Sequence, residues 1–243
     1  MTQLLLSEIT EYVENHIGDF HAAKLRNLES LKLDNILKRK NPYLFRAKGI
    51  GIASDLVKLL MDAFLSSQEE TLFGDFLENL AIFVCSRTYG GRKSTTEGID
   101  LEFERDGQLC LVAIKSGPNW GNSSQIKRMR ENFRQAARVY RTNNRTVNIL
   151  AINGCCYGRD NNPDKGDYQK LCGQHFWEFI SQNPNLYIEL IEPLGYKAKT
   201  RNEAFLQKYD NLVNRFSQLF SEHYCIDGNI DWTKLVRFSS ESR

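Results

Sequence analysis

Two residues in the middle of the chain, Asp100 and Lys115, have side chains that together could hold a metal ion and activate water. Apolar and acidic residues alternate over 99–104, which is the pattern of a half-buried strand. The dipeptide Asp106-Gly107 is a strong signal for a tight hairpin turn, and 109–115 has the character of a partner strand. The sequence therefore predicts a hairpin that brings the acid and the amine together.

The register of this hairpin determines which side chains share a face. If Glu104 pairs with Leu109 across the turn, Asp100 faces Ala113, and Lys115 is the diagonal neighbour of Asp100 on the same face. Carboxylates on adjacent strands can hold a hard cation such as Mg²⁺. A lysine beside them can orient or deprotonate water and stabilise developing negative charge, while the metal polarises a phosphoryl oxygen. These are the groups that phosphodiester hydrolysis requires.

An ordinary solvent-facing hairpin explains the same spacing equally well, and the choice between the two depends on context. The tripeptide Gly98-Ile99-Asp100 leads into the first strand, and Lys115-Ser116-Gly117-Pro118 leads towards a strongly basic segment. This context favours a functional site.

A basic helix is predicted from Ser123 or Ser124 to about Tyr140. Arginines follow at steps of three or four residues and form one stripe: Arg130, Arg134, Arg138, Arg141 and Arg145. The planar guanidinium group suits phosphate. A solvated helix face is the alternative, but the helix starts soon after Lys115, so a basic surface beside a metal site suits a polyanion.

The composition is that of an ordinary globular protein. The 243 residues include 32 Lys and Arg against 30 Asp and Glu, for a net charge of +2. Apolar stretches fall short of the roughly 20 residues that a membrane span needs, so no membrane partner is expected. The N-terminus lacks a basic signal-peptide region, and the six cysteines are irregularly spaced, which predicts a cytoplasmic protein.

The predicted elements form an α/β fold with a central mixed β-sheet flanked by helices and a helical N-terminal region. Helical patterns are expected early in the chain, over 54–65 and 73–84, again over 176–180, and over 202–220. Strands are expected at the hairpin, over 146–153, and over 186–191.

The hairpin motifs resemble a known active site. Gly98-Ile99-Asp100 and Val112-Ala113-Ile114-Lys115 are similar to the active-site hairpin of the PD-(D/E)XK nuclease superfamily. The run 114–119 followed by Asn122-Ser123-Ser124-Gln125, together with 40–44, resembles type II restriction endonucleases over roughly residues 35 to 195. The resemblance implies a restriction-endonuclease-like fold in which Asp100 binds the metal and Lys115 is the catalytic lysine.

The chain departs from this pattern at Ala113, where the superfamily usually has its second acid. Glu102 on the same face of the hairpin or Glu78 on a neighbouring helix could supply the missing carboxylate, and these two are equally favoured. Glu131 is a weaker candidate. An inactivated variant, natural or engineered, is the remaining alternative.

The resemblance implies a Mg²⁺-dependent type II restriction endonuclease that cuts double-stranded DNA at a specific short sequence, with Mn²⁺ able to replace Mg²⁺. It further implies a homodimer and a companion DNA methyltransferase that protects host DNA. The alternatives are another PD-(D/E)XK nuclease, of the repair or junction type, and a catalytically inactive DNA-binding relative.

Residues 1–243 are expected to form a single nuclease domain. Within it, 1–70 is a helical part for dimerisation or DNA contact, 71–195 is the catalytic core, and 196–243 is a C-terminal helix and tail. The expected DNA contacts are basic and polar residues that flank the hairpin: Arg87, Arg92, Lys93, Asn119, Asn122, Ser123, Ser124, Gln125, Lys127, Arg130 and Arg134.

Overall fold

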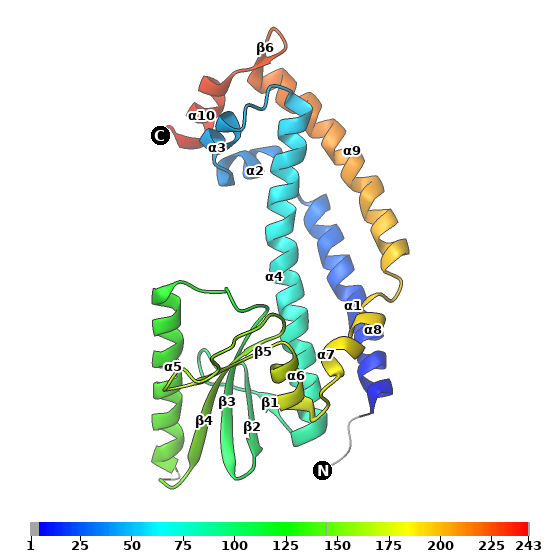
Figure 1. Ribbon diagram of the computed structural model, residues 1–243. Helices are drawn as coiled ribbons and strands as arrows, with labels where there is room; N and C mark the ends of the chain where they lie inside the picture. The colour runs from blue at the N-terminus through cyan, green and yellow to red at the C-terminus, as the bar shows by residue number, and fades with distance from the viewer. Residues whose placement is uncertain (1–4, 144, 243) are drawn as a thin grey trace. The chain divides into compact units, whose positions relative to one another are not determined.

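The computed structural model describes residues 5–143 and 145–242, which divide into two compact units (Figure 1). Unit 1 comprises Met1–Ile17 and Phe73–Tyr196, and unit 2 comprises Gly18–Leu72 and Lys197–Arg243. The second segment of unit 1 nearly coincides with the predicted catalytic core, 71–195. The expectation of a single nuclease domain stays a prediction.

Unit 1 contains a five-stranded mixed sheet, which confirms the predicted α/β class. The strands run in the spatial order β1-β2-β3-β4-β5. Their bounds are β1 Arg92–Lys93, β2 Leu101–Arg105, β3 Gln108–Lys115, β4 Asn148–Cys155 and β5 Gln169–Cys172. The pairs β1–β2 and β2–β3 are antiparallel, whereas β3–β4 and β4–β5 are parallel.

The β2–β3 hairpin has the predicted register, with Glu104 opposite Leu109 and Glu102 opposite Leu111. Its turn places Asp106 at φ 51° and Gly107 at φ 73°. Two consecutive residues with positive φ match the twist of the flanking strands, and Asp-Gly adopts this conformation readily. The turn sequence therefore fixes the register, and the register fixes the face on which Asp100 and Lys115 lie.

Helices cover both faces of the sheet in unit 1 (Figure 1). On one face, Tyr89 near the end of α4 (Ala53–Tyr89) stacks on Phe103, with ring centroids 5.3 Å apart. Phe179 of α6 (Gln174–Ser181) packs on the same ring at 5.8 Å. On the other face, α5 (Ser123–Asn143) buries Leu111 and Ala113. The solvent-facing alternative for the acidic face of the hairpin is therefore wrong, because α5 covers its centre.

The expected strand over 186–191 is wrong, since the structure has α7 (Leu186–Glu189) and α8 (Ile191–Leu194) there. Leu186 and Leu190, four residues apart, are buried, whereas Ile188 and Ile191 are exposed. This burial follows a helical period rather than the alternation of a strand. The strand that completes the sheet is β5, which is too short to give a clear alternating pattern.

The two helices predicted over 54–65 and 73–84 are one continuous helix, α4, of 37 residues. The polar segment between them does not interrupt it. The Ser67 hydroxyl donates to the carbonyl of Ala63, and the Thr71 hydroxyl donates to the carbonyl of Ser67, each one turn back. Both hydroxyls are therefore hydrogen-bonded within the helix.

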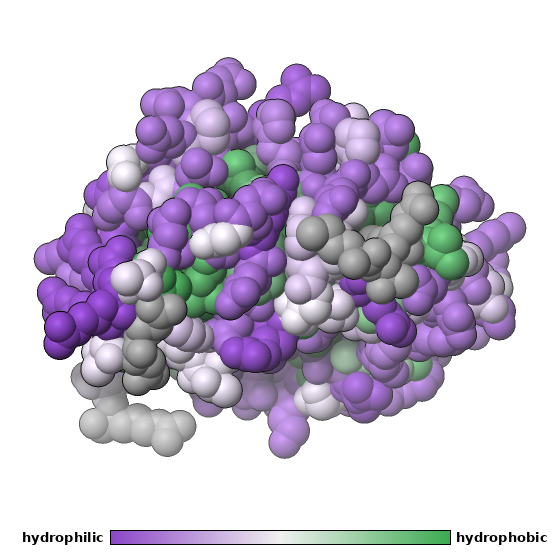
Figure 2. All heavy atoms as spheres, turned by 90° about the horizontal axis from the view of Figure 1, so that it is seen from below, coloured by the Kyte–Doolittle hydropathy of each residue, from purple (hydrophilic) through white to green (hydrophobic). Residues whose placement is uncertain are grey.

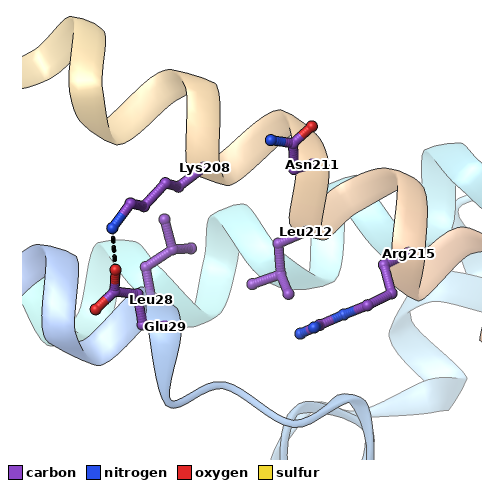
Figure 3. Close-up of a pocket in the computed structure, with 6 residues that line it drawn as sticks. All are labelled: Leu28, Glu29, Lys208, Asn211, Leu212 and Arg215. Carbon is purple, nitrogen blue, oxygen red and sulfur yellow. Dashed lines mark hydrogen bonds and ion pairs between the residues drawn. The ribbon is translucent and has the colours of Figure 1, made fainter.

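Unit 2 is helical, with a core formed by residues such as Ile36, Met61 and Phe220. It contains the end of α1 (Leu6–Glu29) and the first part of α4. Its other elements are α2 Leu33–Arg39, α3 Pro42–Ala47, α9 Ala198–Tyr224, β6 Cys225–Ile226, β7 Asn229–Ile230 and α10 Trp232–Ser240. A pocket of about 320 Å³ lies between α1 and α9, where Lys208 pairs with Glu29 and Arg215 points into the opening (Figure 3).

The described helices include none that is both long enough and apolar enough to span a membrane. The face of the molecule in Figure 2 is mainly hydrophilic, with hydrophobic residues visible in small areas between polar ones.

Candidate active site

Lys115 ends β3 and Asp100 immediately precedes β2, so the hairpin brings the two residues together. The N–H of Asp100 donates to the carbonyl of Val112 (2.9 Å), which extends the strand pairing by one residue. Asp100 Oδ2 accepts the N–H of Ile114 (2.7 Å) and lies 3.7 Å from Lys115 Nζ. Side-chain exposure is 22% for Asp100 and 34% for Lys115, so both groups are held by the fold yet reachable by a ligand.

The Asp100 carboxylate fits a hard divalent cation. Its Oδ2 is fixed by the backbone, and within residues 5–143 and 145–242 no hydrogen bond reaches Oδ1. In that same part of the chain no three His, Cys, Asp or Glu side chains gather into a metal-binding group. Mg²⁺ usually binds one or two carboxylates and takes its other oxygens from water and substrate phosphates. The donor set therefore suits Mg²⁺ better than an ion that needs a complete protein cage.

Glu78 of α4 lies near the Lys115 end of the hairpin. One turn before it, a Cβ at Gly74 would lie 2.8 Å from Ser116 Oγ, so the helix packs against the residue that follows Lys115. Burial, aided by the charge of Glu78 and opposed by that of Lys115, raises the pKa of the Cys156 thiol to about 12. Glu78 and Lys115 are therefore both close enough to the same thiol to affect its ionisation.

Glu102, the other favoured candidate for the second carboxylate, is buried in a hydrogen-bond network. Its Oε1 accepts from Arg92 Nε (2.8 Å), and its Oε2 accepts from Ser94 Oγ (2.8 Å) and Tyr140 OH. Burial acts to raise the pKa of Glu102, but the hydrogen bonds from Tyr140, Ser94 and Arg92 outweigh it and leave the pKa below its ordinary value. Both oxygens of an ionised Glu102 are thus engaged by protein groups, which disfavours metal binding there.

The superfamily's usual acidic position, Ala113, and the weaker candidate, Glu131, lie in different surroundings. Ala113 is 1% exposed beneath α5, so the superfamily's usual acidic position is part of the packed interface. Glu131 is on the exposed side of α5, where its 57% exposed side chain lies 4.0 Å from Lys127. Neither position therefore supplies a carboxylate beside Asp100.

The sequence reasoning missed Trp120, whose ring lies near Lys115, and Asn153, which bonds to Trp120. Asn153 Nδ2 donates to the carbonyl of Ala113 (3.2 Å), and Asn153 Oδ1 accepts from Trp120 Nε1 (3.0 Å). The Lys115 ammonium lies 5.5 Å from the centroid of the Trp120 ring. A polar asparagine inside an apolar strand and a tryptophan five residues after the lysine were the available signals.

Comparison with known families agrees with this geometry. The model of the type II restriction endonuclease EcoO109I family matches residues 7–202. The chain belongs to this family. The predicted resemblance to restriction endonucleases is thereby confirmed, and the match extends beyond the expected 35–195 at both ends. Among curated proteins, no significant match is found.

In this member of the EcoO109I family, the arginine stripe of α5 borders a groove of about 280 Å³. Asp167 pairs with two of its arginines, at 3.0 Å from Arg130 Nε and 3.2 Å from Arg134. The full lining comprises Arg130, Phe133, Arg134, Ala137, Arg138, Arg141, Ile149, Ala151 and Asp167. Four arginines against one acid leave the groove with a positive charge, although two of the arginines are already paired.

Polar residues predicted to contact DNA form the start of α5 in this EcoO109I-family chain. Asn122 Oδ1 accepts from the N–H of Gln125 (3.1 Å) and from Ser124 Oγ (2.7 Å). Gln125 Oε1 accepts in return from the N–H of Asn122 (2.9 Å), which is the reciprocal pattern of a capping box. Ser123 and Asn119 beside them are exposed. The capping contacts explain these residue types without DNA, so their DNA contacts remain proposals.

The other predicted DNA contacts are exposed basic side chains, each paired with an acid. These pairs are Arg87 with Glu8 (3.8 Å), Arg92 with Glu102 (2.8 Å), Lys93 with Glu78 (3.2 Å) and Lys127 with Glu131 (4.0 Å). Their exposed fractions range from 53% to 78%. Exposed pairs of this kind contribute little to stability and can exchange partners.

Proposed function

We propose that this chain is a Mg²⁺-dependent restriction endonuclease that hydrolyses double-stranded DNA at one specific short sequence. The observation that carries the proposal is the approach of the Asp100 carboxylate to the Lys115 ammonium, 3.7 Å apart at the open end of the hairpin. Membership of a type II restriction endonuclease family supports the same reaction.

Asp100 and Lys115 have separate tasks in the proposed reaction. Asp100 would hold the divalent ion, which would supply Lewis-acid polarisation of a phosphoryl oxygen. The Lys115 ammonium orients the attacking water and donates hydrogen bonds to the negative charge that develops on the phosphate oxygens. The N–H of Ile114 fixes the Asp100 carboxylate beside the lysine, so both groups are in position before substrate arrives. In-line attack then leaves a 5′-phosphate and a 3′-hydroxyl.

Glu78 is the proposed second carboxylate. It lies near the Lys115 end of β3, where its charge influences the Cys156 thiol, and its side chain is 24% exposed. Its Lys93 partner is 66% exposed and could move to a DNA phosphate, which would free Glu78 Oε1. Glu102 is less suitable, because three side chains already donate to its oxygens.

The substrate and assembly follow from the same proposal. Basic side chains flanking the hairpin, with the residues at the start of α5, contact the DNA. A homodimer would match the two-fold symmetry of a palindromic site, and a methyltransferase of the same system would protect host DNA. Mn²⁺ would replace Mg²⁺ because it accepts similar oxygen ligands.

Plasmid digestion tests the reaction. Supercoiled plasmid is incubated with the wild-type chain and Mg²⁺, with EDTA, and with the variants Asp100→Ala and Lys115→Ala. We expect discrete fragments with Mg²⁺ only, and loss of cleavage in both variants with an unchanged circular dichroism spectrum. Glu29→Ala and Lys208→Ala, from an ion pair on unit 2, are matched controls expected to retain activity.

Three outcomes would contradict the proposal. Full activity in Asp100→Ala or Lys115→Ala would refute the assigned residues. Cleavage of branched or damaged DNA without sequence preference would favour a repair or junction nuclease. Salt-dependent DNA binding without cleavage would favour an inactive relative, the alternative to which Ala113 gives most support.

A further inference from the structure

We propose that Trp120 and Asn153 are positioning residues for the Lys115 ammonium, an inference that rests on the proposed function of the same site. Lys115 Nζ lies 5.5 Å from the centroid of the Trp120 ring and 3.7 Å from Asp100 Oδ2. An ammonium group within about 6 Å of an indole face is attracted by the ring's quadrupole. The lysine is thus held between a carboxylate and an aromatic ring.

Asn153 fixes the orientation of that ring. Its amide is buried, with 1% exposure, and it lies opposite Ala113 in the parallel β3–β4 pair. Nδ2 donates to the carbonyl of Ala113, while Oδ1 accepts from Trp120 Nε1. A buried amide is costly unless its polar atoms are paired. Both groups of this side chain are paired, and one of those bonds sets the angle of the indole.

The loop between the lysine and the tryptophan is also anchored. Across 116–119, the carbonyl of Ser116 accepts the N–H of Tyr157 (3.0 Å), and the carbonyl of Pro118 accepts Lys170 Nζ (2.9 Å). These bonds tie the loop to the segments that follow β4 and to β5. The backbone that connects Lys115 to Trp120 is therefore held in one conformation, which keeps the indole near the ammonium.

The consequence for catalysis is a restricted lysine. A free lysine side chain samples many rotamers, and only a few of them place Nζ beside the Asp100 carboxylate. Contact with the Trp120 ring excludes many of the unproductive lysine rotamers before DNA binds. Since a misplacement of about 1 Å can reduce a rate by about 100-fold, loss of the ring should lower the rate of cleavage rather than the affinity for DNA.

Kinetics of two substitutions test this role. Trp120→Leu removes the ring and the Nε1 bond, whereas Trp120→Phe keeps an aromatic face and loses only the bond. We expect kcat to fall by about 10- to 100-fold in Trp120→Leu, and by a smaller but measurable factor in Trp120→Phe, whose ring is no longer oriented by Asn153. KM, and the Kd for DNA measured without divalent ions, should stay within about twofold of wild type. Trp232→Leu, in unit 2, is the matched control and should retain the wild-type kcat.

An unchanged kcat in Trp120→Leu would overturn the inference, as would a fall in kcat that matches a weaker Kd or a loss of folded protein. Equal loss in Trp120→Phe and Trp120→Leu would also overturn it, because the ring face would then be irrelevant.

A spectroscopic measurement separates this inference from the proposed function. Lys115→Met removes the charge beside the indole, so we expect a shift in tryptophan emission that disappears when the same substitution is made in Trp120→Phe. An identical shift in both backgrounds, or none in either, would overturn the contact. If the wild-type chain failed to cleave DNA, the proposed function would fall, while this emission shift would still report whether the ring and the ammonium meet.

Discussion

Glu78 and Glu102 should respond oppositely when each carboxylate is converted to an amide. Glu102 is 6% exposed and accepts hydrogen bonds from three side chains, whereas Glu78 is partly exposed and pairs with Lys93 at 3.2 Å. The structure thus gives Glu102 a folding role, and the proposal gives Glu78 a role in catalysis. Glu102→Gln and Glu78→Gln therefore test stability and activity separately.

The cost of Glu102→Gln can be worked from its contacts. A hydrogen bond to a charged group contributes about 1.5–3 kcal/mol, and the two partly buried donors are Tyr140 and Ser94. The Arg92 side chain is 77% exposed, so its ion pair adds only about 0–1 kcal/mol. Glutamine keeps one oxygen acceptor but has no charge, and its NH2 group would face the Arg92 guanidinium, which cannot accept, or a hydroxyl of Tyr140 or Ser94 that would have to stop donating. We expect the free energy of unfolding to fall by about 2–4 kcal/mol.

Glu78→Gln should instead leave stability nearly unchanged, since an exposed ion pair contributes about 0–1 kcal/mol. Cleavage should fall by about 100-fold or more if the carboxylate helps to hold the metal, because transition-state charge would lose one stabilising contact. Urea unfolding gives the stability of each variant, and plasmid cleavage across a Mg²⁺ titration gives its activity. Glu104→Gln, exposed on the same hairpin, is the matched control and should change neither quantity.

Two results would refute this reasoning. Wild-type cleavage in Glu78→Gln would remove Glu78 from the metal site. A Glu102→Gln variant that is as stable as wild type but inactive would transfer the catalytic role to Glu102, and would mean that its network opens when DNA and metal bind.

Three further predictions concern DNA binding, pH and the approach to the site. Asp167→Asn frees two arginines in the α5 groove, so DNA affinity measured by fluorescence anisotropy should rise and the slope of log K against log salt should steepen by up to about 2; an unchanged slope would contradict this. Burial acts to raise the pKa of Glu102, but its hydrogen bonds, led by that from Tyr140, outweigh burial and leave the pKa lowered. The contribution of ionised Glu102 to the free energy of unfolding is therefore complete above about pH 4.3 and is lost as pH falls through the folded-state pKa. Urea unfolding between pH 3 and 7 should show a smaller acid-dependent loss in Tyr140→Phe; equal losses would exclude the network as the cause. Gly98→Ala places a Cβ against Asn132 at φ 73°, so it should displace the loop before Asp100 and lower cleavage and thermal stability together, whereas wild-type values of both would be inconsistent with that contact.

The hairpin shows how far local sequence can predict geometry in this protein. Alternation of apolar and acidic residues, followed by Asp106-Gly107, determined two strands and their register, and the register brought Asp100 to Lys115. These features depend on residues near one another in the chain, because the turn conformation and the strand period of two act over a few positions. The helix that carries the arginine stripe was predictable for the same reason, from its capping residues and its period.

The surroundings of these elements depend on contacts between segments that are distant in the chain. The packing of α5 onto the sheet buried Glu102 and joined it to Tyr140, and the packing of α4 brought Glu78 towards Lys115. The same dependence explains the helices at 186–194, where burial on one side of an apolar run selected the helical period. Local sequence patterns were enough to predict which groups share a strand face. Which of them remain open to a metal and a phosphate depended on contacts between distant segments, because solvent exposure is a property of the packed chain rather than of its local pattern.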